Sequence, residues 1–183
     1  MIFTETPLAG AFVVEPEPYR DDRGLFARTF CKNEFSKLNH TKEFVQFNHS
    51  QTLKKGTIRG MHYQLPPYSE IKLIRCIRGR VFDVIIDLRK DSPTFLKYHA
   101  VELSEQNMLS YYIPEGFAHG FQTLEDDSQL IYHHTAFYVP GHEAGIRYND
   151  PLIGIDWPLP VTVITDKDRN HEFLTRSFKG LSI

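Results

Sequence analysis

The chain has 183 residues, of which 41% are hydrophobic, 13% aromatic and 24% charged. These values are typical of a single globular domain over residues 1–183, and they exclude a disordered or collagen-like chain. The formal net charge of −2 excludes an overall positive field for nucleic acid or an anionic membrane surface.

The amino terminus and the cysteines bear on the compartment. The opening sequence MIFTETPLAG has no basic region followed by an apolar stretch, so we expect no signal peptide. No segment approaches the ~20 apolar residues that a membrane helix needs. Cys31 and Cys76 lack C-x-x-C spacing, which favours two reduced thiols and leaves a disulfide or metal role as the alternative. We therefore expect a cytoplasmic protein with no membrane partner.

The clearest strand is predicted over Arg80–Leu88, where every second residue is apolar and should face a core. The turn Arg78-Gly79-Arg80 just before it indicates a β-hairpin with the segment IKLIRC. Further β-type runs are separated by turn residues. They are Phe12–Glu15, Leu25–Phe30, Phe44–His49, Thr57–Gln64, Tyr98–Leu103, Leu109–Ile113 and Gln129–Tyr138.

Helices are few, with short ones expected over Glu34–Asn39 and Thr165–Leu174. Many short strands and little helix predict an all-β jelly roll or closed barrel. The irregular segment Val139–Trp157 is long enough to be functional, and we expect it near the mouth of the barrel. No glycine-rich phosphate loop follows a strand, which argues against bound NAD or a nucleotide-hydrolysing P-loop.

Two histidine motifs point toward a barrel interior. In Arg59–Gln64 (RGMHYQ), His62 shares a strand face with Gly60 and Gln64, although a lone histidine is usually a hydrogen-bonded core or surface group. Ile113–Gly120 contains P-x-G-x-x-H, which resembles the second motif of the cupin superfamily and directs His119 into the barrel.

The pattern argues against a catalytic metal. A metal cupin supplies H-x-H, but this chain reads His62-Tyr63-Gln64, and Glu70 cannot replace the missing histidine. The nine histidines form no other ligand-spaced cluster in the sequence, and the neighbours His133 and His134 should face opposite ways. We therefore expect no metal and no cofactor.

Two further features are ambiguous by themselves. Tyr132 shares a face with His134 and Tyr138 if the strand over Gln129–Tyr138 is unbroken, and a tyrosine there is more often packing than an acid. Thr165 and Asp168 have the spacing of a helix N-cap and its N3 partner, which does not prevent Asp168 from orienting a histidine.

Nine motifs in order resemble one family, the dTDP-4-dehydrorhamnose 3,5-epimerases, from about Thr6 to Asp168. The motifs are DxRGxF (21–26), QFNHS (46–50), RGMHYQ (59–64), KLIRC (72–76), GRVFDV (79–84), DLRKDSPT (87–94), IPEGFAHGF (113–121), NDP (149–151) and IDWP (155–158). The resemblance implies a metal-free cupin jelly roll with a few short peripheral helices. It also implies a homodimer in which the N-terminal strands are swapped, so that Arg23 and Phe26 reach the neighbour's pocket.

The resemblance also implies the chemistry. A ketone at sugar C4 acidifies the hydrogens at C3 and C5, and His62 would be the base that removes one of them. Tyr132 would be the acid on the opposite face, and Asp168 would fix the tautomer of the histidine. Lys72 would stabilise negative charge on the C4 oxygen.

Substrate binding is implied residue by residue. Arg23, Arg59 and Lys167 match the positive groups near the diphosphate of a dTDP-linked sugar. Further matches to substrate contacts are Phe26, Phe47, Asn48, His49, His119, Tyr138 and Glu143. The chain departs from the family pattern at Arg28, where glutamate is common, which bears on recognition of the nucleotide.

Three alternatives to a 3,5-epimerase stay open at this point. A close relative that inverts only C3 or only C5 shares the base and the acid. A non-catalytic sugar-binding cupin would not need the retained His62, Tyr132 and Lys72. A metal-dependent cupin would contain stoichiometric zinc or iron.

Overall fold

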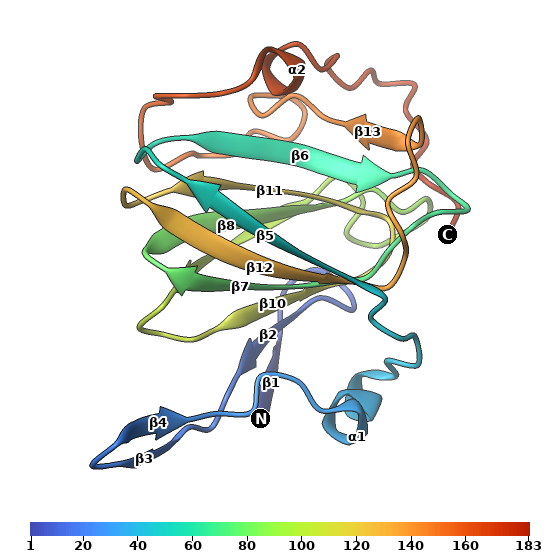
Figure 1. The fold of residues 1–183 in the computed structure, drawn as a ribbon. Helices are drawn as coiled ribbons and strands as arrows, with labels where there is room; N and C mark the ends of the chain where they lie inside the picture. The colour runs from blue at the N-terminus through green and yellow to red at the C-terminus, as the bar shows by residue number, and fades with distance from the viewer.

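Two antiparallel sheets pack face to face in the computed structural model, which describes residues 1–183 (Figure 1). The six-stranded sheet contains, in spatial order, β1 (Ile2–Glu5), β2 (Phe12–Glu15), β10 (Ser110–Ile113), β7 (Lys72–Arg78), β12 (Ser128–His134) and β5 (Gln46–Thr52). The five-stranded sheet contains β13 (Glu143–Gly145), β6 (Ile58–Gln64), β11 (Phe117–Thr123), β8 (Arg80–Asp87) and β9 (Tyr98–Ser104). The predicted all-β jelly roll is confirmed.

The remaining elements lie at the periphery. β3 (Tyr19–Asp21) and β4 (Gly24–Phe26) form a separate hairpin that projects away from the barrel (Figure 1). The helices are α1 (Lys32–Phe35), a 3₁₀ turn over Ser36–Leu38, and α2 (Asp166–Arg169). None of them has the length and apolar character that crossing a bilayer requires.

Strand β8 is buried on both faces. Val84 and Ile86 pack outward beneath the C-terminal segment with Leu88, as the alternation predicts. Val81 and Ile85 point the other way, into a cluster of 12 buried residues that fills the barrel interior. The strand therefore contributes to two cores, because the chain around Ile146–Trp157 and near Leu181 covers the outside of the sheet.

The predicted hairpin at Arg78-Gly79-Arg80 is wrong in its pairing, although the turn is present. β7 ends at Arg78 and β8 begins at Arg80, but the two strands belong to different sheets. Gly79 has φ of 69°, and a Cβ there would lie 2.7 Å from the Ser128 hydroxyl. A glycine is therefore needed to turn the chain sharply from one sheet to the other.

Several predicted boundaries shift. The run Leu25–Phe30 is a strand only to Phe26, and β12 ends at His134 instead of Tyr138. α2 ends at Arg169, well before Leu174, and its N-cap is as predicted, since the Asp168 amide donates to the Thr165 hydroxyl at 3.2 Å. β1, β3, β11 and β13 lacked a strong alternating pattern and were not predicted.

Candidate active site

A cavity of about 730 Å³ opens between the two sheets. Strands β5, β7 and β12 supply one wall, and β6, β11 and β13 supply the other, with α2 at the rim. Of the residues that the sequence predicts for the site, eleven line this cavity: His49, Asn48, Arg59, His62, Lys72, His119, Tyr132, Tyr138, Glu143, Lys167 and Asp168. Residues far apart in the sequence thus meet in one place.

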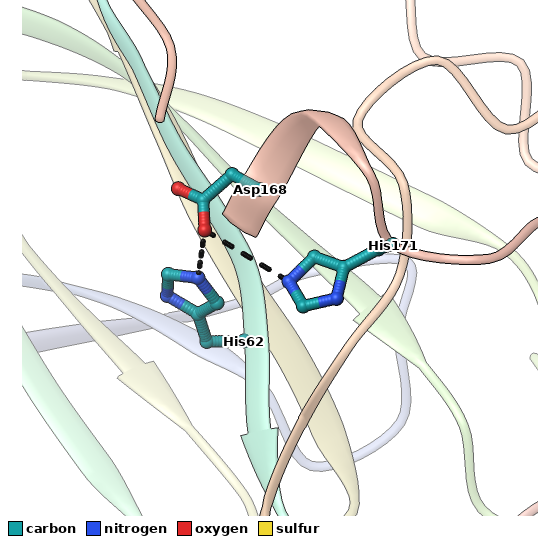
Figure 2. Close-up of side chains that lie close together, drawn as sticks. All are labelled: His62, Asp168 and His171. Atoms are coloured by element: carbon teal, nitrogen blue, oxygen red, sulfur yellow. Dashed lines mark hydrogen bonds and ion pairs between the residues drawn. The ribbon is translucent and has the colours of Figure 1, made fainter. Parts of the chain in front are cut away.

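His62 and Asp168 form a hydrogen-bonded pair on the β6 wall (Figure 2). Nε2 of His62 lies 2.7 Å from Oδ1 of Asp168, and Oδ2 accepts a hydrogen bond from the Gly60 amide at 3.2 Å. Burial by itself would raise the pKa of Asp168, but these bonds and the neighbouring imidazole outweigh it, so the pKa is lowered. An ionised Asp168 accepts a hydrogen bond from Nε2–H of His62. Nδ1 of His62 is then the nitrogen with a free lone pair.

Gly60 allows this wall to pack closely against β11. Its φ is 128°, and a Cβ at this position would lie 2.5 Å from the Cα of Gly120. Only glycine accommodates that contact. The amide of Gly60 consequently stays in reach of Asp168, and the RGMHYQ motif positions the pair through its backbone as well as through His62.

Tyr132 projects from β12 on the opposite sheet. Its hydroxyl lies 3.5 Å from the Ser50 hydroxyl, and its ring contacts the His119 ring edge-on with centroids 6.1 Å apart. Burial raises the pKa of Tyr132, because the phenolate would lose its hydration. The phenol therefore keeps its proton at neutral pH and can donate it.

His119 forms a second imidazole–carboxylate pair deeper in the barrel. Its Nε2 lies 2.9 Å from Oδ1 of Asp83, and both side chains are buried. Complete burial lowers the pKa of His119, so the ring stays neutral and donates Nε2–H to Asp83. Asp83 was not predicted, although its place within the alternating strand DVIID directs it inward.

Lys72 is held by a chain of hydrogen bonds that sequence reasoning missed. Its ammonium lies 3.3 Å from the carboxylate of Glu70. The same carboxylate accepts a hydrogen bond from Nδ1–H of His134 at 2.8 Å. Nε2 of His134 in turn lies 3.2 Å from the Asn48 amide. Burial would raise the pKa of Glu70, but the bond from His134 and the charge of Lys72 outweigh it, and the pKa is lowered. Lys72 and His134 are paired across β7 and β12. This register belongs to the fold, which is why the contact was not predicted from the sequence.

The rim of the cavity is polar. Lys167 and Glu143 form an ion pair with each other, and Nε of Arg59 donates to Thr52 at 2.9 Å. Tyr138 lies beyond the end of β12 but still reaches the cavity, and it is 54% exposed. The long segment after Val139 reaches the cavity only through Glu143 on β13, which pairs with the C-terminal end of β6, whereas its later part from Ile146 to Trp157 packs on the outside of the sheet.

Three predicted residues lie outside this cavity. Phe47 does not line it, and its ring packs on the ring of His133, with centroids 4.6 Å apart. Arg23 and Phe26 lie on the projecting hairpin, where Phe26 is 78% exposed. Arg28 forms an ion pair with Glu34 at 3.0 Å near the chain start.

The fold brings together one group of possible metal ligands that the spacing of histidines in the sequence does not reveal. His171, which the sequence did not single out, lies beside the His62–Asp168 pair (Figure 2). The ligand atoms of these three residues all lie within 4.8 Å of one another. The spacing was invisible in the sequence because His62 comes from β6 and the other two follow Thr165.

Comparisons with known proteins point to one enzyme family. The sequence profile described as dTDP-4-dehydrorhamnose 3,5-epimerase matches residues 5–176. The enzyme of that name from Shigella flexneri is 44% identical over 169 residues, covering 92% of this chain and 93% of the relative.

Two solved structures share the fold closely. The dTDP-4-dehydrorhamnose 3,5-epimerase of Bacillus anthracis, with TDP and PPi bound, is 39% identical with a TM-score of 0.91 and covers 94% of this chain and 99% of its own. The Legionella pneumophila dTDP-6-deoxy-D-glucose-3,5-epimerase, in complex with dTDP-4-keto-L-rhamnose, is 38% identical with a TM-score of 0.89, at 94% and 92% coverage. This chain therefore belongs to the dTDP-4-dehydrorhamnose 3,5-epimerase family.

Proposed function

We propose that this isomerase inverts C3 and C5 of the sugar in dTDP-4-dehydro-6-deoxy-D-glucose, forming dTDP-4-dehydro-L-rhamnose, with His62 as base and Tyr132 as acid. Membership of the family supports the reaction. The observation that carries the assignment of roles is geometric. A histidine from one sheet and a tyrosine from the other line the same cavity, so a sugar between them would meet them on opposite faces.

The base is His62. The C4 ketone acidifies the adjacent C–H bonds, and Nδ1 of His62 takes the proton because Nε2 is engaged by Asp168. The ionised Asp168 stabilises the imidazolium that forms and holds the ring in one tautomer. Loss of the proton leaves an enolate, whose negative charge lies mainly on the C4 oxygen.

Lys72 stabilises the enolate, and Tyr132 protonates it. The ammonium of Lys72 offers positive charge from a buried position on the cavity wall, where electrostatic stabilisation is stronger than in bulk water. Tyr132 then donates its phenolic proton to the carbon from the face opposite His62, and the centre is inverted. Exchange with solvent returns a proton to Tyr132 and removes one from His62, and the same groups then serve the second carbon.

The rim residues would hold the nucleotide. Arg59 and Lys167 supply positive charge for the diphosphate, and the exposed ring of Tyr138 offers a stacking surface for a base. Arg28 lies outside the cavity of its own chain and is paired with Glu34. Arg28 would therefore contribute to nucleotide recognition only in the pocket of a partner subunit.

The quaternary structure we propose is a homodimer with exchanged N-terminal strands. The β3–β4 hairpin stands clear of its own barrel, with the Arg23 side chain 87% exposed and the Phe26 ring nearly bare (Figure 1). An exposed phenylalanine on a projecting hairpin favours a partner surface. β1 is also an outer strand of its sheet, with one edge free for pairing.

Solvent exchange tests the reaction. The enzyme is incubated with dTDP-4-dehydro-6-deoxy-D-glucose in D₂O with a metal chelator, and the sugar protons are followed by NMR. We expect loss of signal at both C3 and C5. Loss at one carbon would reduce the enzyme to a mono-epimerase, and no exchange would contradict the proposal. Exchange that appears only when the chelator is omitted would indicate a metal-dependent enzyme.

Mixed dimers test the exchange of strands. A His62→Ala chain and an Arg23→Ala/Phe26→Ala chain are each expected to be nearly inactive. Random reassortment should restore about a quarter of the pockets, since half of the dimers are mixed and each holds one pocket with both contributions. Activity no greater than that of the separate variants would refute the exchanged arrangement.

A further inference from the structure

His171 holds a buried ring nitrogen for which the fold provides no partner. Its Nε2 is shielded from solvent and makes no hydrogen bond. The nearest charged oxygen is Oδ1 of Asp168 at 3.8 Å, which is too long for a hydrogen bond. A buried polar atom without a partner is unfavourable and calls for an explanation, such as an ion or ligand that the site is built to receive.

The surroundings hold this ring tightly. A Cβ on Gly145 would lie 2.2 Å from Nε2 of His171, so β13 packs directly on the imidazole. The ring is inclined at 76° to that of His62, with centroids 5.9 Å apart, and both point at the same carboxylate (Figure 2). Asp168 is held from behind by the Gly60 amide and by its own helix N-cap. The three side chains are therefore positioned before any ligand arrives.

We propose that Nε2 of His62, Oδ1 of Asp168 and Nε2 of His171 bind one zinc-like divalent transition-metal ion, and that the bound ion inhibits the enzyme. The three atoms lie within 4.8 Å of one another, so small adjustments bring them to a common ion. Two imidazoles and one carboxylate suit zinc, cobalt or nickel, whereas magnesium and calcium require oxygen ligands.

The charges around the cluster admit a cation, because Asp168 supplies a carboxylate that is only 5% exposed and already bonded to His62. The neighbouring cation, Lys167, is paired with Glu143. His62 and Asp168 line the cavity, and the His62 side chain is 31% exposed, which gives the ion a path of entry.

Inhibition follows from the tautomer of His62, and this step rests on the proposed function. In the metal-free pair Nε2 carries the proton and Nδ1 is the base. When the ion takes the lone pair of Nε2, the proton of the neutral ring must reside on Nδ1. The hydrogen bond between His62 and Asp168 is replaced by their bonds to the ion, and Nδ1, which then carries the proton, cannot accept the C3 or C5 proton.

Metal binding is tested without reference to catalysis. The chelator-treated protein is titrated with Co²⁺, whose visible absorption reports tetrahedral nitrogen–oxygen coordination, and with Zn²⁺ by calorimetry. We expect one ion per chain, and affinity reduced at least about tenfold in His171→Asn, because one of three ligands is lost. The matched control His142→Asn, which removes a histidine outside the cluster, should bind as the original chain does.

Activity supplies the second measurement. Zn²⁺ should inhibit solvent exchange in the original chain and in His142→Asn, with reversal by chelator. In His171→Asn the metal-free activity should be preserved and the inhibition shifted at least about tenfold. If that variant does not fold, His171→Phe replaces it, which keeps a ring against Gly145.

The outcomes separate the two proposals. Absence of binding, or binding that ignores the loss of His171, would overturn the metal site. Absence of solvent exchange in the metal-free protein would overturn the proposed function and leave the cobalt titration to decide the site on its own.

Discussion

The two ends of the barrel interior differ sharply, although the same strands build both. At the open end Lys72 on β7 pairs in register with His134 on β12, and both line the cavity. Four residues farther along, Cys76 pairs with Leu130, and both are fully buried in the interior core. One sheet thus changes from a polar lining to an apolar core within a single strand length.

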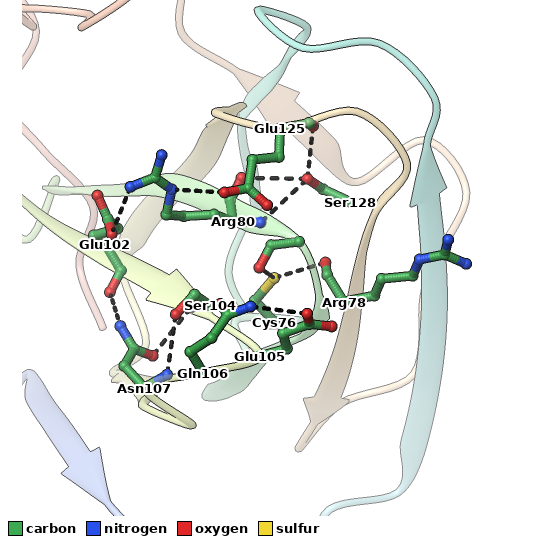
Figure 3. Close-up of polar contacts among 11 residues, drawn as sticks. Cys76, Arg78, Arg80, Glu102, Ser104, Glu105, Gln106, Asn107, Glu125 and Ser128 are labelled. Atoms are coloured by element: carbon green, nitrogen blue, oxygen red, sulfur yellow. Dashed lines mark hydrogen bonds and ion pairs between the residues drawn. The ribbon is translucent and has the colours of Figure 1, made fainter.

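The polar groups at the closed end serve the turns instead of the interior (Figure 3). Cys76 Sγ donates to the Arg78 carbonyl at 3.1 Å, and the Ser128 hydroxyl donates to the Glu125 carbonyl at 2.8 Å. Burial raises the pKa of Cys76 to about 11, so the thiol stays neutral. Arg80 also forms ion pairs there with Glu102 at 3.5 Å and Glu125 at 3.2 Å, but neither pair lines the cavity, whereas the His62–Asp168 pair at the open end does. The difference teaches that the open end has the polar lining that the proposed chemistry needs, whereas the closed end contributes packing and turns.

Removing the base should have the largest effect. His62→Ala should lower the exchange rate at C3 and C5 by about 10²–10⁴-fold, because it removes the imidazole whose Nδ1 is left free by the bond to Asp168. NMR in D₂O measures the rate. The control His133→Ala removes a histidine that points away from the cavity and packs on Phe47, and its rate should be unchanged. Substantial exchange in His62→Ala would rule out the proposed base.

A closed-end substitution should affect stability alone. Leu130→Ala should lower the free energy of unfolding by about 2–5 kcal/mol, because it leaves a cavity in the interior core. Urea denaturation measures this loss, which should exceed that of Ile131→Ala, whose side chain points out of the barrel. The folded Leu130→Ala enzyme should keep most of its exchange rate, because Leu130 does not line the cavity. A large loss of turnover would mean that the two ends are coupled.

The acid should be separable from the base. Tyr132→Phe should slow inversion about 10²-fold while the first proton is still removed by His62, so washout at C3 or C5 should exceed epimer formation. NMR distinguishes the two signals in one experiment. Tyr98→Phe, on the outer side of the five-stranded sheet, serves as the control. Inversion at the normal rate in Tyr132→Phe would assign the acid elsewhere.

The smallest effect concerns pH and Asp168. Its pKa is lowered in the folded state from an unfolded value of about 3.9, so its ionised form stabilises the fold. This contribution is present above about pH 4 and is lost as pH falls through the folded pKa. The stability difference between the original chain and Asp168→Asn should therefore shrink between pH 6 and about pH 3. Urea unfolding at both values measures it, and a pH-independent difference would contradict the assignment.

Much of the fold was predictable from local pattern. The strand over Phe12–Glu15 has the predicted bounds, and the alternation in Arg80–Leu88 correctly identifies the residues that face the outer core. The turn at Arg78-Gly79-Arg80 was also predicted, but the pairing of the two strands beside it was wrong. A sharp turn has the same sequence pattern whether its strands pair or belong to two sheets. β11, with Gly120 in its middle, lacks the alternation that marks a strand.

For the site, the sequence by itself placed His62 and Lys72 in local motifs, whereas Tyr132 and Asp168 were ambiguous alone and gained an expected role only from the family resemblance. Only the tertiary structure decided which of these side chains contact one another. His62 and Asp168 are 106 positions apart, and His134 and Glu70 are 64 apart. Local patterns depend on neighbours along the chain, whereas these pairs, and the placing of His171 beside Asp168, exist only once two sheets and a C-terminal helix have packed around one cavity.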